Sequence, residues 1–114
     1  MIKVKVNKAE KDNRILAVVI KGHANYDNSG KDIVCSAVSA LAIGAVNSVE
    51  TLLNIDLILE EDIKYGGFLT WKVPVMDDPA LDQKLQLLMQ ALVESLLMVE
   101  QEYNKYLQVS IETS

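Results

Sequence analysis

The chain has 114 residues, of which 50% are hydrophobic and 24% are charged, a balance typical of a folded protein with one domain over residues 1–114. Its single cysteine excludes an internal disulfide and fits a reducing compartment. The net charge of −5 is uneven, because residues 1–31 carry +4 and residues 32–114 carry −9. This acidic bulk argues against direct nucleic-acid binding and suits a basic protein partner.

Two strands are predicted in the first part of the chain. Apolar residues alternate with lysines over residues 2–6, which predicts a half-buried strand and lacks the continuous apolar stretch of a secretory signal peptide. After a turn at residues 10–13, the segment 14–21 is apolar on both faces and predicts a more central strand. A polar segment with turn chemistry, from Gly22 to Lys31, then predicts a loop.

A helix and a hairpin should follow this loop. An uncharged run that begins at Ile33 predicts a helix to about Leu53, apolar nearly all round, heavily buried and slightly short for a membrane span. Alternation over residues 55–60 and 69–73 predicts two strands, joined by a glycine turn at residues 65–67.

The last part of the chain predicts a second helix and a final strand. Asp78 before a proline is typical of a helix start, and apolar residues at helical spacing continue the helix to about Tyr106. A surplus of apolar residues beside the main stripe, including Leu97 and Met98, suggests a homodimer contact. Alternation over residues 107–112 predicts the last strand.

The predicted order of elements is therefore ββαββαβ. Several strands carry one polar face, so we expect an α/β protein of the α+β type. Its architecture should be a two-layer sandwich, in which two helices cover one face of a mostly antiparallel sheet. The other face of the sheet should be partly wet, and no membrane association is expected.

The only histidine and the only cysteine of the chain bracket the polar loop. His23 lies in a Gly-His-Ala sequence, and Cys35 follows Asp32 near the predicted helix start. A thiol needs a nearby base, or another influence that stabilises the thiolate, to act as a nucleophile near neutral pH. With Asp32 as the N-cap, Cys35 falls in the first helical turn, where unpaired N–H groups favour a thiolate and could serve as oxyanion donors.

These residues by themselves leave three interpretations of Cys35 open. It could be a nucleophile with His23 as its base, a core residue of a non-catalytic protein-binding module, or a redox-sensing thiol. No metal site or cofactor is predicted, because one histidine and one cysteine cannot fill a structural zinc site and no phosphate-binding glycine loop is present. Ser39, one turn beyond Cys35 on the same helix face, could hydrogen-bond locally or simply pack.

Two sequence blocks carry a family resemblance. They are GHA at residues 22–24 and DIVCSAVS at residues 32–39, separated by a short loop that contains Gly30. Together they closely resemble the signature of the ribosomal-processing cysteine proteases, and the length and order of elements fit that family over nearly the whole chain. Ser36, where alanine is common in the family, is a small departure that does not touch the histidine or the cysteine.

The resemblance implies a bacterial, cytoplasmic cysteine endopeptidase that removes the N-terminal extension, apolar or aromatic in character, from a large-subunit ribosomal protein. It implies His23 as the base and Cys35 as the nucleophile, with Asp32 and Ser39 in supporting roles. Gly22 and Gly30 flank the polar loop, which we expect to order over the substrate. The alternative is a non-catalytic ribosome-associated module with a structural cysteine.

Overall fold

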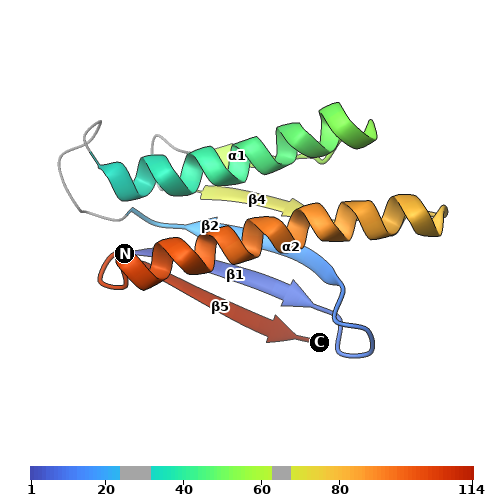
Figure 1. The fold of residues 1–114 in the computed structure, drawn as a ribbon. Helices are drawn as coiled ribbons and strands as arrows, with labels where there is room; N and C mark the ends of the chain where they lie inside the picture. Colours follow the sequence, from blue (N-terminus) through green and yellow to red (C-terminus); the bar gives the residue numbers. More distant parts are fainter. Residues whose placement is uncertain (24–31, 63–67) are drawn as a thin grey trace.

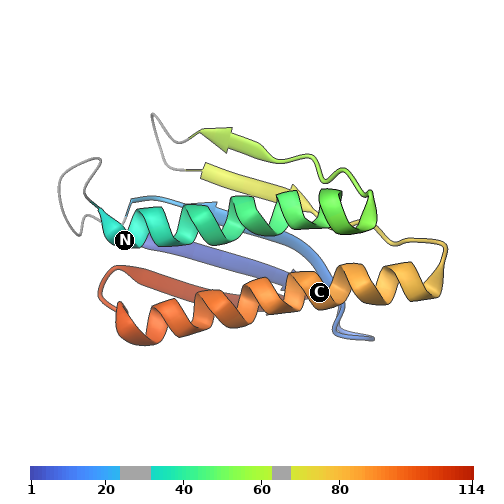
Figure 2. The same cartoon turned by 45° about the horizontal axis from the view of Figure 1, so that its top comes forward.

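The computed structural model describes residues 1–23, 32–62 and 68–114. One open sheet runs in the spatial order β3-β4-β2-β1-β5, and both helices lie along the same face of it (Figure 1). Figure 2 shows the two helices side by side in front of the sheet. The predicted fold class is therefore confirmed. The elements are β1 (Ile2–Lys8), β2 (Ile15–Lys21), α1 (Ile33–Leu53), β3 (Glu60–Asp62), β4 (Phe68–Lys72), α2 (Pro79–Glu102) and β5 (Leu107–Thr113).

The strand predicted to be central lies at the middle of the sheet. β2 pairs antiparallel with β1 on one side and with β4 on the other. β1 pairs in parallel with β5, so that Ile2 lies opposite Leu107. Alternate apolar residues of β1 are buried, while Lys3 and Lys5 between them are exposed. The sequence alternation therefore reports correctly which face of the sheet the helices cover.

The helix α1 is less buried than its sequence predicts. Its fully buried residues form one stripe at spacings of three or four, and Leu52 and Ile33 outside that stripe are exposed. By length and composition α1 could cross a membrane. This is weak evidence for a membrane span, because a helix that packs one face on a sheet can pass the same test. The prediction of a heavily buried helix was wrong, because only one side of α1 packs against the sheet and α2. The stripe is Val34, Val38, Ala42, Val46 and Val49.

The helix α2 begins where predicted but ends earlier. Asp78 caps it, with a proline at the first helical position. The helix stops at Glu102 rather than near Tyr106. The carbonyl of Tyr103 accepts the N–H groups of Tyr106 and Leu107, and this turn redirects the chain into β5.

The third strand is displaced from its predicted position. The alternating segment 55–59 is not paired with a neighbour, and β3 covers only the three residues that start at Glu60. The alternation still describes burial, because Ile55 and Leu57 are buried whereas Ile58 is 78% exposed. Side-chain burial and strand pairing are therefore separate outcomes in this part of the chain.

A partly buried ion pair joins the beginning of β2 to α2. Nη1 and Nη2 of Arg14 donate to the two carboxylate oxygens of Asp82 at 2.9 and 3.0 Å. The Asp82 Oδ1 atom also accepts the N–H of Met76 at 2.9 Å, so the same carboxylate holds the segment before α2. These hydrogen bonds, above all those from Arg14, lower the pKa of Asp82 from 3.8 to about 2.

We expect Asp82→Asn to lower the free energy of unfolding at neutral pH by about 1–3 kcal/mol, the scale of hydrogen bonds to a charged group. Because folding lowers the pKa of Asp82, its contribution to stability is complete above pH 3.8 and is lost as the pH falls toward about 2. Urea unfolding across that interval should show the wild-type protein losing stability more steeply than the variant.

Asp77→Asn is a matched control, since Asp77 is exposed one position before the cap of α2. This variant should keep the wild-type stability at neutral pH and the wild-type slope in acid. Equal acid slopes for wild type and Asp82→Asn would show that the ion pair does not carry the pH dependence.

Candidate active site

A capping carboxylate starts the helix α1. Asp32 has an extended backbone, and its Oδ1 atom accepts the N–H groups of Val34 at 3.1 Å and Cys35 at 3.0 Å. Asp32 is 8% exposed and is the one charged residue that is buried in the described part of the chain. The predicted N-cap is confirmed, and two short hydrogen bonds fix the helix start.

Cys35 lies in the first turn of α1, where the sequence predicts it. Its side chain is half-buried and packs against the hydrophobic core. The thiol is therefore at the positive end of the helix dipole, with part of its surface still accessible. This environment favours the thiolate more than a position in the middle of the helix would.

The N–H groups of the first turn are not available as the sequence predicts. Val34 and Cys35 donate to the Asp32 side chain, and Ser36 donates to the Asp32 carbonyl at 3.1 Å. The cap and the first helical bond use these three donors, so they could hold an oxyanion only after a rearrangement, and the expected oxyanion role of the first turn stays a prediction. An oxyanion at Cys35 would need donors from elsewhere, or a rearranged cap.

His23 approaches the site from the end of β2. The strand ends at Lys21, and Gly22 follows with φ +92°, a backbone region that glycine tolerates. A Cβ atom at Gly22 would lie 2.5 Å from the carbonyl oxygen of Met1, so a side chain there would force the chain away from the start of β1. This close passage leads directly to His23, which is exposed.

A small cavity brings the predicted residues together. It encloses about 80 Å³ and is bordered by Gly22, His23, Cys35 and Ser39. The only imidazole and the only thiol of the chain therefore face one shared space. Gly30, together with the other residues of the segment 24–31, lies outside the described residues, so the expected ordering of the loop over a substrate stays a prediction.

The sequence did not reveal which apolar residues form the walls of this cavity. Alternation predicts that most of them are buried, but it does not say that they meet beside the thiol. That meeting depends on the order of strands across the sheet, which places the ends of β1, β2 and β4 under the start of α1. The walls are Ile2, Ile20, Val38, Phe68 and Leu69.

Comparison with known proteins identifies the family of the chain. The model of the family described as "Cysteine protease Prp" matches residues 1–108. The chain is 38% identical over 101 residues to the ribosomal processing cysteine protease Prp of Bacillus subtilis (strain 168), an alignment that covers 87% of this chain and 88% of that protein.

Two solved structures share the fold. The ribosomal processing protease Prp from S. aureus with a covalently linked product peptide has a TM-score of 0.84 and 28% identity, covering 98% of this chain and 100% of that chain. The same protease with a substrate peptide has a TM-score of 0.81 and 26% identity, covering 98% and 100%. Over nearly all of its length, this cysteine-type peptidase therefore belongs to the family of the cysteine protease Prp.

Proposed function

We propose that this chain removes the N-terminal extension of a large-subunit ribosomal protein, with Cys35 as the nucleophile and His23 as the general base. The observation that carries the proposal is the shared cavity, which the only thiol and the only imidazole both border at a helix start. Relatives named as ribosomal processing proteases support the substrate class.

Each step of the reaction uses one of these two side chains. His23 takes the proton of the Cys35 thiol, and the thiolate attacks the scissile carbonyl carbon. The peptide C–N bond breaks as His23 returns the proton to the leaving amine, which leaves a thioester on the sulfur. Water then attacks the thioester while His23 accepts its proton, and the C–S bond breaks. The new C-terminal carboxylic acid leaves, and His23 returns the proton to the sulfur.

Asp32 supports this chemistry through the backbone. Its carboxylate is committed to the N–H groups of Val34 and Cys35, so it positions the residue that bears the thiol. A carboxylate close to a thiol would by itself oppose thiolate formation. The favourable effect of Asp32 is therefore positional, and Ser39 contributes to the wall of the same cavity one turn further along α1.

The exposed side of α2 bears on the proposed assembly. It carries two large apolar side chains, Leu87 at 68% and Met98 at 70% exposure, among polar residues such as Lys84, whereas Leu97 packs against the core. A shallow depression of about 300 Å³ between the helices is lined by small and apolar residues, Gly44 and Ala91 among them. We expect a two-fold homodimer through this face. The cytoplasmic location and the protein substrate are carried by the family resemblance, and the lack of direct nucleic-acid binding by the acidic charge balance.

Cys35→Ala should abolish peptide cleavage without disturbing the fold, and His23→Ala should lower the cleavage rate about a hundredfold or more, the scale of a positioned acid–base group. The assay is mass spectrometry of an N-terminally extended ribosomal protein before and after incubation. Iodoacetamide labelling of the native protein supplies the control, since an accessible nucleophile is alkylated with loss of cleavage whereas a core cysteine resists. Wild-type cleavage by Cys35→Ala would exclude the mechanism.

Asp32 has an alternative role, in which its carboxylate orients the imidazole of His23 instead of capping α1. Substitutions at Asp32 should separate these two roles. Asp32→Asn keeps an oxygen acceptor for the helix start, so its thermal stability should stay close to wild type, whereas Asp32→Ala should lose about 1 kcal/mol or more. Cleavage should follow stability in both variants if Asp32 acts as the cap. A stable Asp32→Asn variant that cleaves poorly would instead assign the carboxylate to His23.

Light scattering should report a dimer at micromolar concentration for the wild-type protein. Leu87→Lys should shift the protein toward the monomer, because it places a charge on the apolar helix face. Val75→Lys is the matched control, since Val75 is also exposed but precedes α2 rather than lying on the helix pair. A monomeric wild-type protein would contradict the assembly and leave the catalytic proposal intact.

A further inference from the structure

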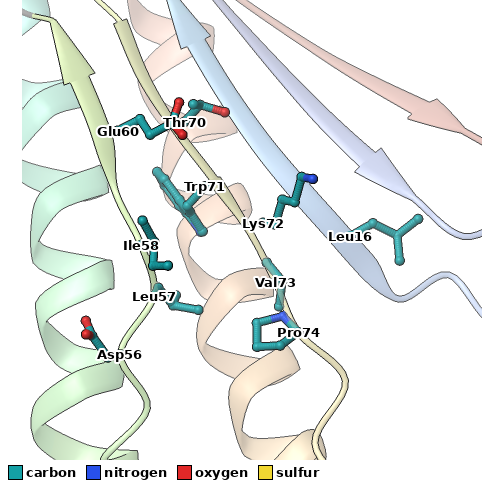
Figure 3. A pocket seen from close by; sticks show the side chains of 10 residues that line it. All are labelled: Leu16, Asp56, Leu57, Ile58, Glu60, Thr70, Trp71, Lys72, Val73 and Pro74. Atoms are coloured by element: carbon teal, nitrogen blue, oxygen red, sulfur yellow. The ribbon is translucent and has the colours of Figure 1, made fainter.

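A second, larger cavity lies on the sheet away from the candidate active site. It encloses about 710 Å³ between β4 and the segment 55–59, which runs beside β4 without pairing (Figure 3). Its position is at the far end of β4 from Phe68, which lines the small cavity at the thiol. We call this cavity the edge groove, and the proposed chemistry does not use it. Its lining residues include Leu57, Ile58, Trp71, Lys72, Val73 and Pro74.

The edge groove exists because the β3–β4 ladder stops early. β3 pairs with β4 as far as Glu60 opposite Thr70. Continuing that register would place Ile58 opposite Lys72. The next hydrogen-bonded pair would place Asp56 opposite Pro74, which has no N–H to donate. The segment 55–59 keeps the alternating burial of a strand but lies apart from β4. The space between them runs parallel to β4, as an additional strand would.

Backbone groups face into this space from β4. The N–H of Val73 donates to the carbonyl of Leu16 on β2 at 2.8 Å, so Val73 uses its backbone groups toward β2. In an antiparallel strand the neighbouring residue points its N–H and C=O to the opposite side. Lys72 therefore presents both groups to the edge groove, and within the described ranges no backbone partner meets them there.

The other side of the edge groove can pair in the same phase. Glu60 faces β4 in the β3 ladder, and Ile58 is two residues earlier in a segment with strand-like alternation. The backbone groups of Ile58 therefore share the phase of Glu60 and point toward β4. A strand placed in the edge groove would have a hydrogen-bonding neighbour on each side, at Lys72 and at Ile58.

The side chains around the edge groove define the chemistry of its occupant. Leu57 and Val73 contribute apolar surface on the side of the core, while Asp56 and Glu60 stand along the segment that borders β4 (Figure 3). Two carboxylates against the single ammonium of Lys72 leave the rim negative. The lining therefore favours a strand that alternates apolar residues, directed to the core side, with basic residues, directed to the carboxylates.

We propose that the edge groove is an exosite that binds an extended, alternating apolar and basic segment of the substrate protein by strand addition. This proposal rests on the proposed function only in assuming that the partner is the protein that the enzyme cleaves. The exosite is separate from the thiol, so it would hold the substrate at a point distant from the scissile bond. Such a second contact raises the local concentration of the cleavage site at Cys35.

The test uses the full chain carrying Cys35→Ala, so that binding is measured without turnover. The probe is a fluorescein-labelled peptide that alternates valine and arginine, compared with a peptide that has glutamate for arginine. We expect anisotropy to show at least about tenfold tighter binding of the arginine peptide. Methylating either of two neighbouring nitrogens at the centre of the peptide should weaken binding, because successive N–H groups of the added strand face Lys72 and Ile58 in turn.

Two further measurements locate the peptide. Amide hydrogen exchange at Lys72 should slow when the peptide binds, whereas β5, the opposite edge of the sheet, should be unaffected. In the same background, Asp56→Lys should weaken binding several-fold, while Glu102→Lys, an equally exposed charge reversal at the far end of α2, should not. Equal affinities in these two variants, or unchanged binding of the centrally methylated peptides, would overturn the exosite. If the wild-type enzyme cleaves the extended ribosomal protein but the valine–arginine peptide does not bind, the exosite is excluded and the proposed function stands.

Discussion

The buried carboxylate of Asp32 is the constraint on which the site depends. A charge held at 8% exposure is costly unless its oxygens are hydrogen-bonded, and here one oxygen accepts two backbone N–H groups at 3.0 and 3.1 Å. Those bonds determine where α1 begins, and the first turn determines where the Cys35 sulfur lies. The buried stripe of α1 then holds the helix against the sheet along its length. The cap and the stripe together fix the position of the thiol.

The two ends of β2 serve different purposes. The candidate active site draws its residues from the ends of β1, β2 and β4 and from the start of α1, all at one end of the sheet. The Arg14–Asp82 pair ties the start of β2 to α2 at the other end of that strand. One end of β2 is thus fastened by charge, while the other passes through Gly22 to an exposed imidazole. The start of β2 is therefore held in place, while its end leads to a side chain that a substrate can reach.

Much of the fold follows from local patterns, and the exceptions have physical causes. Asp32 and Asp78 each sit before an apolar run, so both helix starts are predictable from capping alone. The alternation from Ile55 predicts burial correctly but not pairing, because a longer ladder would reach Pro74, which lies just beyond β4 and lacks a donor. The approach of His23 to Cys35 was predictable only through the loop that they bracket. The apolar walls between them depend on strand order, which periodicity does not encode.

The parallel pairing of β1 with β5 has a consequence for synthesis. The first strand of the chain is completed by the last, so the outer edge of β1 stays open until residues 107–113 have emerged. During that interval an unpaired apolar edge is a template for association with other chains. Lys3 and Lys5, which alternate with the buried residues of β1, place charge on that temporary edge and disfavour such pairing. The lysines that look like ordinary surface residues in the finished sheet thus act as gatekeepers for the nascent chain.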